Sequence, residues 1–539
     1  MKRNIIFLIG ALVCFSVACK KDFLNHPSTT GPTTDNYYNN AEQVNGATGI
    51  LYNNVWGDWF DKAFSSVGDL LGGTITGTQG NDQYNSFYNF NIQSTDGLVS
   101  STWNSCYKAA GQASVLIQTF RDKKALLGGG ANTVFLDNGI AEARFIRGFA
   151  YFYIGRTFGD APIVDNPLDL TKPGAYLVPK YHQKDVLRFA LEDLQAAADG
   201  LPEIAAQDGR VTKYAALGMM AKVYLYLKDY PNAAAKAKLV IDYSNGAGNG
   251  VLGLNDDYNA MFTSSTAANK KNKENLFSLR WLSEMSWNGG NRFSIYAAPQ
   301  PLVHPKPTGG SGYSAIVPSF DMLNPATGYE TADKRRGWSV MQQGFHKDLW
   351  KNDNFPNGFT YDTTGKATDD HFIFTGTRSN IQKYIVGPNR GTDEPVTPDG
   401  HTSMPTYILR YADVLLIYAE AVLGGAGSTS DAGALEAFNK VHNRAGLTSL
   451  SSININDILH ERKVEFAFEG DYWFDIQRQG FAKAQQIIAS QERGTLDGNG
   501  KLTSFKATLN SEKQLFLPIP QAETAQDPKL LEPAVDYYK

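Results

Sequence analysis

Two polar stretches of the chain carry aromatic residues in a pattern suited to binding sugars. Residues 80–90 read GNDQYNSFYNF, and residues 281–296 read WLSEMSWNGGNRFSIY. A sugar ring has an apolar face edged by hydroxyl groups, so a flat aromatic ring can cover the face while amides and charged groups hydrogen-bond the edge. The candidate ligand-binding residues are therefore Tyr84, Phe87, Tyr88, Trp281, Trp287, Asn291, Arg292 and Tyr296. We expect the greatest exposure at Trp287, beside Gly289 and Gly290. The alternative is that these rings fill a small core, as most buried aromatics do.

No catalytic or metal-binding motif accompanies these stretches. The eight histidines are scattered without an HExxH pair, which argues against a zinc site. The sequence has no GxSxG, no phosphate-binding loop and no GxGxxG in a strand-to-helix setting. Its Asn- and Asp-rich loops could hold Ca²⁺, but none has EF-hand spacing, and solvated turns are the better interpretation. We therefore expect a protein that is not an enzyme and needs no cofactor.

A further group of ionisable side chains lies in residues 461–478, ERKVEFAFEGDYWFDIQR. In a helix, Arg462 and Glu469 would share the face of the apolar Leu459 and Phe466. A buried charge is tolerated only when it is paired and hydrogen-bonded, so Arg462 is predicted to lie partly buried against Glu465, Glu469 or Asp475. Crowded carboxylates could also form an acid–base pair. The interleaved Arg and Lys residues favour a structural ion network, and we assign it no chemistry.

Helical hairpins are predicted to position these residues. In residues 410–423, Ala412, Leu415, Leu416 and Ala419 share one face, and the glycines from Gly424 end the helix. A second helix is expected from about Asp431. Similar pairs are indicated in residues 141–163 and 212–242, where Pro231 fits the first turn of a helix. Such pairs are similar to tetratricopeptide units and should stack into a curved, mostly α-helical solenoid.

The helical pattern divides the chain into parts. Residues 41–242 are predicted to form an N-terminal helical part that opens with a helix from Ala41 to about Phe60. Residues 243–408 are rich in Gly, Asn, Pro and Thr, so they are predicted to be an inserted irregular subdomain of loops and short strands. Residues 409–539 are predicted to form the C-terminal part, which contains the helical hairpin. Loops carried on such a scaffold are where binding usually occurs.

The N-terminus has the pattern of a lipoprotein leader. Lys2 and Arg3 precede an apolar run too short to span a bilayer, and small residues stand just before Cys19. We predict cleavage after residue 18, a lipid such as palmitate on Cys19, and a tether over residues 19–40. The alternative is an ordinary signal peptide with a chance cysteine. Cys106 alone would then remain as a free thiol, so the exported chain would depend on packing rather than disulfides.

Composition excludes some classes of partner. The 539 residues carry a net charge of −4 with a pI near 6.1, and no block of like charge occurs. A nucleic-acid partner would require a basic field, so none is expected.

Four motifs carry a resemblance to a known family. RYADVLLIYAEA (Arg410–Ala421), NRAGL, ERKVEFAFEGDYWFDIQRQG and LFLPIPQAE (Leu515–Glu523) resemble the C-terminal part of SusD/RagB proteins. The resemblance implies a nutrient-binding lipoprotein on the surface of the outer membrane of Bacteroidota. It also implies that oligosaccharides are captured on loops between the early helices and the insertion and passed to a SusC-like, TonB-dependent transporter.

Other readings of the same scaffold stay open at this point. RagB-like members take peptides, so the ligand could be a peptide. A helical-repeat adaptor could instead hold only protein on its concave face, and a lipidated glycosidase is a further alternative.

Overall fold

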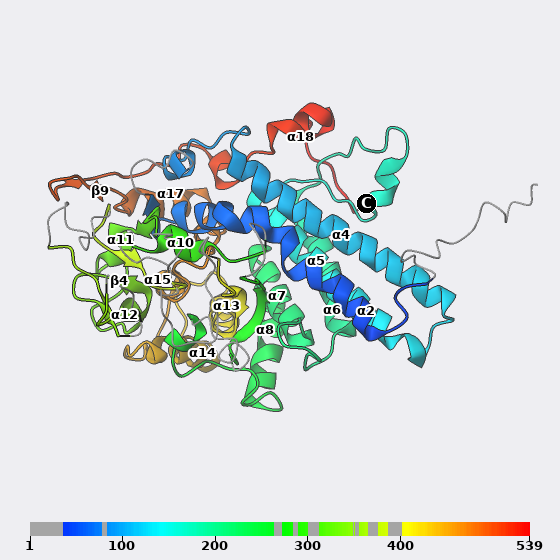
Figure 1. Cartoon of the computed structure of the whole chain (residues 1–539), viewed down its shortest axis with the longest axis horizontal. Coiled ribbons are helices and arrows are strands. Elements are labelled where there is room, and N and C mark those ends of the chain that lie inside the picture. Colours follow the sequence, from blue (N-terminus) through cyan, green and yellow to red (C-terminus); the bar gives the residue numbers. More distant parts are fainter. Residues whose placement is uncertain are drawn as a thin grey trace, which may run out of the picture.

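The structure is a computed structural model that describes residues 36–77, 84–262, 272–283, 289–299, 312–348, 350, 355–364, 376–385 and 401–538. Long helices run side by side through the right and centre of Figure 1. They are α2 (Ala41–Gly49), α4 (Gly97–Leu126), α5 (Val134–Phe158), α6 (Gln183–Gly200), α7 (Lys213–Tyr226) and α8 (Tyr230–Asn245). The C-terminal part contributes α13 (Tyr411–Leu423), α14 (Ala432–Arg444), α15 (Ile455–Glu465), α16 (Tyr472–Gln477), α17 (Phe481–Ser490) and α18 (Gln521–Gln526).

The long helices stack into one array. Each helix from α4 to α8 packs on the next, and α13 then packs on both α8 and α14. The array is therefore continuous in space, although the insertion separates α8 from α13 in sequence. Small residues permit the close packing: a side chain at Gly148 of α5 would meet the carbonyl oxygen of Ala190 in α6 at 2.9 Å. The predicted tetratricopeptide-like solenoid is confirmed.

The ends of these helices follow the predicted residue types. Gly424 ends α13 in the left-handed conformation, with φ of 56°. The Asp431 carboxylate accepts a hydrogen bond from the backbone N–H of Ala434 and so caps α14. Pro231 lies in the first turn of α8, where its missing N–H costs nothing.

Short elements fill the remainder of the described chain. The strands pair in antiparallel ladders: β1 (Ile75–Gly77) with β3 (Ile316–Pro318), β2 (Asn275–Leu279) with β8 (Thr406–Arg410), β4 (Val340–Met341) with β7 (Asn380–Ile381), β5 (His346–Lys347) with β6 (Phe359–Thr360), and β9 (Thr495–Leu496) with β10 (Leu502–Thr503). The short helices are α3 (Asn85–Tyr88), α10 (Phe293–Ala297), α11 (Phe320–Leu323) and α12 (Arg335–Ser339). The 3₁₀ turns outside the first helical segment are η7 (Ala131–Thr133), η8 (Pro167–Thr171), η9 (Asn259–Phe262), η10 (Glu512–Leu515) and η11 (Pro528–Leu531). Strand β8 leads directly into α13, so the β2–β8 ladder joins the insertion to the array. The division of the chain at residues 242 and 408 stays a prediction.

The first helical segment differs from the single helix predicted to end near Phe60. After α2 the chain passes through η2 (Ile50–Tyr52) and η3 (Asn54–Trp56) into two π-helical turns, η4 (Trp59–Ala63) and η5 (Ser66–Leu70). Asn53 interrupts the helix with φ of −135° and ψ of −95°. Its side-chain amide donates to the carbonyl oxygens of Arg280 and Gly289 in the insertion. These tertiary hydrogen bonds hold Asn53 outside the helical conformation.

Buried ion pairs link α13 to α15 and α16. Arg462 is 1% exposed and donates to Asp475 at 2.8 Å and to Asp413 at 2.7 Å. The predicted burial of Arg462 against Asp475 is confirmed. The other two candidates, Glu465 and Glu469, instead pair with Arg410.

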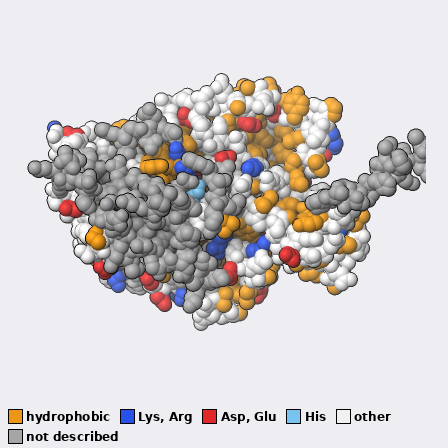
Figure 2. Space-filling model, viewed as in Figure 1, with side chains coloured by type: hydrophobic (Ala, Val, Ile, Leu, Met, Phe, Trp, Pro, Cys, Tyr) orange, Lys and Arg blue, Asp and Glu red, His pale blue; other side chains and the backbone are white. Residues whose placement is uncertain are grey.

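The outer surface has a mixed charge pattern. On the part of the face that Figure 2 colours by side-chain type, basic and acidic groups are interspersed. Within the described ranges, no helix is both long and apolar enough to cross a membrane. The Cys106 thiol is free and buried. The predicted lipidation site, Cys19, and residues 19–35 of the predicted tether lie outside the described residues.

Candidate functional site

The π-helical turns present polar side chains on one side of the first helical segment. Trp56, Trp59 and Phe60 are buried in the core, which leaves Asp58, Asp61 and Lys62 to line a cavity of about 730 Å³. In η4 the N–H of Phe64 bonds to the carbonyl oxygen of Trp59, five residues back. Wide turns of this kind are frequent at functional sites.

The opposite wall of the cavity is formed by α3, the segment that joins α3 to α4, and the start of α4. Its lining is rich in amides and hydroxyls, and the polar members are Asn85, Ser86, Asn89, Asn91, Gln93, Asp96 and Ser101. Such groups can both donate to and accept from the hydroxyl groups of a ligand. We call this space the polar cavity.

Asp61 joins the polar cavity to the second predicted stretch. One of its carboxylate oxygens accepts a hydrogen bond from the Tyr296 hydroxyl at 2.8 Å and an ion pair from Arg292 at 3.0 Å. The Arg292 guanidinium lies 5.3 Å from the centre of the Tyr296 ring, and the Lys62 ammonium lies 5.5 Å from it. Burial, together with the charge of Asp61, raises the pKa of Tyr296 well above its usual value, so its hydroxyl stays protonated.

An exposed aromatic ring stands beside this cluster. The rings of Tyr296 and Tyr313 are 6.1 Å apart, and Tyr313 is 50% exposed whereas Tyr296 is 5% exposed. The Tyr313 backbone N–H donates to Ile295 at 2.7 Å, which fixes the tyrosine against α10. Tyr313 therefore offers an exposed aromatic side chain next to Tyr296, whose hydroxyl bonds Asp61.

The structure brings the described parts of the two predicted stretches together but buries most of the rings in them. Tyr84, Phe87 and Trp281 are between 0% and 4% exposed. Trp281 stacks on Phe60 with ring centres 4.6 Å apart, and its indole N–H donates to Thr406 at 2.9 Å. These three rings hold the walls in place rather than presenting an open face. The Tyr84 hydroxyl is buried near Asp61 and has no hydrogen-bond partner among the described residues.

The other predicted residues have definite positions as well. Tyr88 is half-buried, stacks on Phe505 at 4.4 Å and donates to the carbonyl oxygen of Arg493 at 2.8 Å. Burial raises the pKa of Tyr88 to about 12. Asn291 donates to the carbonyl oxygen of Met404 at 2.8 Å and so anchors the start of α10. Trp287 lies outside the described residues, and ligand contact by all eight residues stays a prediction.

Sequence reasoning missed three residues of this site. In the sequence, Tyr313 stands between Gly312 and Ser314, which is the same pattern of an aromatic ring among small residues that singled out Trp287. Asp61 and Lys62 gave no comparable signal, because nothing in the sequence separates Asp61 from the other acidic residues. Their role depends on how α10 packs against η4.

Together, the fold and the site define a helical-repeat scaffold with a polar cavity whose lining can hydrogen-bond hydroxyl groups. Two family models match this chain: the SusD family over residues 273–537, and a family described as starch-binding and associating with the outer membrane over residues 32–225. The chain belongs to the SusD/RagB family.

Similar proteins match this chain over nearly its whole length. A SusD-like protein of Bacteroides ovatus is 28% identical in an alignment that covers 100% of this chain and 98% of that protein. A crystal structure solved with xylogluco-oligosaccharide is 28% identical and superposes with a TM-score of 0.76, over 92% of this chain and 99% of that one. A laminarin-binding SusD-like protein, 22% identical, has the same fold, with a TM-score of 0.69 over 91% and 98% of the two chains.

Proposed function

We propose that this protein is a cell-surface lipoprotein that captures oligosaccharides and delivers them to a TonB-dependent transporter of the outer membrane, without cleaving them. The observation that carries the proposal is the open Tyr313 ring beside the Asp61–Arg292–Tyr296 cluster and the amide-lined polar cavity. A ring face with hydrogen-bonding groups at its edge matches the two surfaces of a sugar. The similar protein solved with xylogluco-oligosaccharide supports this ligand class.

The charge of the site favours neutral glycans. Asp58, Asp61 and Asp96 line the polar cavity, and Lys62 is the basic residue in that lining. A uronate or sulfate would bring like charge next to these carboxylates, which weakens binding.

Replacing Tyr313 with alanine is expected to weaken binding of a neutral polysaccharide about tenfold, because loss of ring stacking costs roughly 1.4 kcal/mol. Affinity electrophoresis in gels containing xyloglucan or laminarin, with polygalacturonate as the acidic comparison, measures the change. The matched control is Tyr176→Ala, since Tyr176 is also exposed (59%) and does not line the site. Equal retardation of the wild type and Tyr313→Ala would contradict a role for this ring, and a shift with peptides alone would favour the peptide reading.

Replacing Cys19 with serine is expected to abolish attachment of lipid, because the proposed lipid is attached through this thiol. Incorporation of labelled palmitate into the protein measures the change. Cys14→Ser is the control, because Cys14 lies in the part that would be cleaved off. Equal incorporation into Cys19→Ser and the wild type would refute the anchor while leaving glycan binding untouched.

A further inference from the structure

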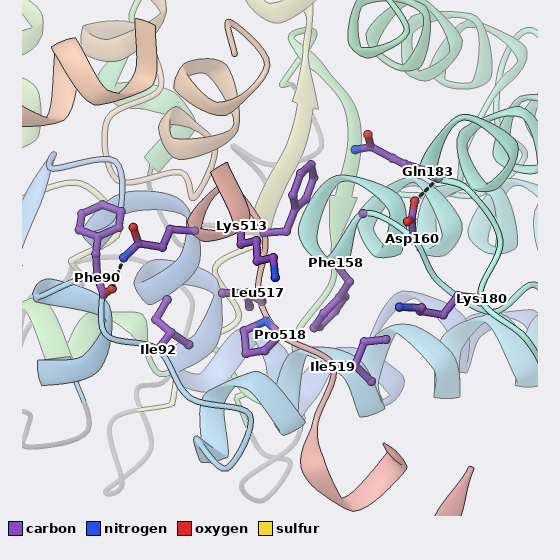
Figure 3. A pocket seen from close by; sticks show the side chains of 13 residues that line it. Phe90, Ile92, Phe158, Asp160, Lys180, Gln183, Lys513, Leu517, Pro518 and Ile519 are labelled. Carbon is purple, nitrogen blue, oxygen red and sulfur yellow. Dashed lines mark hydrogen bonds between the residues drawn. The ribbon is translucent and has the colours of Figure 1, made fainter. Parts of the chain in front are cut away.

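A second cavity shares a wall with the polar cavity and has a more apolar lining. It encloses about 590 Å³ between the C-terminal segment 513–519 and the connection from α5 to α6 (Figure 3). One short segment, residues 89–93, forms a wall of both spaces: Asn89, Asn91 and Gln93 line the polar cavity, whereas Phe90 and Ile92 line the second one. The segment begins in a turn, in which Phe90 has a φ of 53°, and its side chains face the two spaces in alternation, so it separates them. We call the second space the apolar cavity.

Hydrogen bonds between distant parts of the chain hold the walls of the apolar cavity. The Gln514 side chain donates to the carbonyl oxygen of Phe90 at 2.7 Å. The Leu517 backbone N–H donates to Thr157 at 2.8 Å, and the Gln183 side chain donates to Gly155 at 2.9 Å. The cavity is thus formed before any ligand enters, which lowers the entropy cost of binding.

The apolar cavity carries two basic groups that the fold does not neutralise. Lys180 and Lys513 line it, and within the described part of the chain neither ammonium group has an ion-pair or hydrogen-bond partner. In Figure 3 both side chains point toward the space around Phe158. The one carboxylate in the lining, Asp160, already accepts the N–H of Gln183 at 2.9 Å and so caps the start of α6.

Most of the remaining lining is apolar. It comprises the side chains of Phe90, Ile92, Phe158, Phe516, Leu517, Pro518 and Ile519, together with the amides of Gln183 and Gln514. Small-molecule sites in proteins have this composition, with hydrophobic walls, a few placed polar groups and volumes of roughly 300–1,000 Å³.

We propose that the apolar cavity binds a small carboxylate with an apolar ring or chain. The carboxylate lies between Lys180 and Lys513, and the apolar body packs against Phe158, Phe516 and Pro518. This ligand differs from the glycan of the polar cavity, and its binding requires neither the sugar site nor a transporter.

Isothermal titration of the full-length protein with 4-phenylbutyrate and with its neutral amide tests the proposal. The acid is expected to bind at least about tenfold more tightly than the amide, because only the acid forms charge-assisted hydrogen bonds with the lysines. In the double variant Lys180→Gln/Lys513→Gln, binding of the acid should fall to the level of the amide, while binding of the amide should not change. Lys172→Gln, at an exposed lysine paired with Asp169 outside the cavity, should bind like the wild type.

A second variant tests the location independently of charge. Ile92 is only partly buried, so Ile92→Trp should fold and fill the cavity, abolishing binding of both compounds. Equal affinity for acid and amide, undiminished binding of the acid in the double lysine variant, or undetectable binding of the acid to the wild type would each overturn the proposal. None of these results bears on glycan binding, which affinity electrophoresis reports separately.

Discussion

Replacing Arg462 with methionine is expected to lower the free energy of unfolding by about 3–5 kcal/mol, the usual cost of removing one partner from a buried ion pair. Methionine keeps most of the volume of the side chain, so the loss would come from charge and hydrogen bonding rather than from a cavity. Urea unfolding followed by tryptophan fluorescence measures the shift of the midpoint, with the slope unchanged.

The size of this effect follows from the balance of positive and negative charges in the cluster around Arg462. Salt bridges link four cations to four carboxylates in this region of the described chain: Arg156, Lys222, Arg462 and Arg478 with Asp413, Glu420, Asp471 and Asp475. Burial opposes the charge on Arg462, but Asp475, Asp413 and Asp471 outweigh it and raise the pKa of its guanidinium well above the usual value. Removing Arg462 would leave one buried negative charge without compensation.

A surface ion pair supplies the control for this prediction. Lys238 contacts Asp242 at 2.7 Å one helical turn away, and both side chains are 57% exposed. Lys238→Met also removes one cation from an ion pair, but the expected change is below about 1 kcal/mol because water screens the pair. A similar loss in both variants would show that burial of the Arg462 network is not the source of its effect.

Replacing Gly68 with alanine is expected to destabilise the protein by about 3 kcal/mol, near the upper end of the usual cost of overpacking. A Cβ at Gly68 would lie 2.1 Å from the carbonyl carbon of Gly470, a distance that requires the two segments to separate. Next to this contact, the Asp69 carboxylate accepts the backbone N–H groups of Phe468 at 3.0 Å and Gly470 at 2.8 Å. Separation would break these bonds, and the same unfolding assay would detect the loss.

A glycine-to-alanine substitution at Gly111 should have the opposite effect on stability. Gly111 lies within α4, and a Cβ there would meet no atom within 4 Å. Gly111→Ala should therefore stabilise the protein by about 0.5–1 kcal/mol through helix propensity. Because η5 continues the helical segment that carries Asp61, Gly68→Ala should also weaken glycan retardation, whereas Gly111→Ala should leave it unchanged. Destabilisation by both variants would argue against the Gly68–Gly470 contact as the cause.

Periodic patterns in the sequence predicted much of the scaffold. The helix that became α13 could be predicted from its 3–4 spacing of apolar residues and the glycine at 424, because both signals are local. The burial of Arg462 followed from its place on an apolar face. The break at Asn53 could not be predicted in this way, because its partners Arg280 and Gly289 lie more than 200 residues away.

The candidate site was also predictable from the sequence only in part. The sequence by itself determined the family, the hairpin solenoid, and that residues 80–90 and 281–296 mix aromatic rings with amides. Only the tertiary structure decided that Tyr84, Phe87, Trp281 and Tyr296 are buried, that Tyr313 is open, and that Asp61 joins the two stretches. The physical reason is that residue type sets what a side chain can bind, whereas its exposure depends on long-range packing.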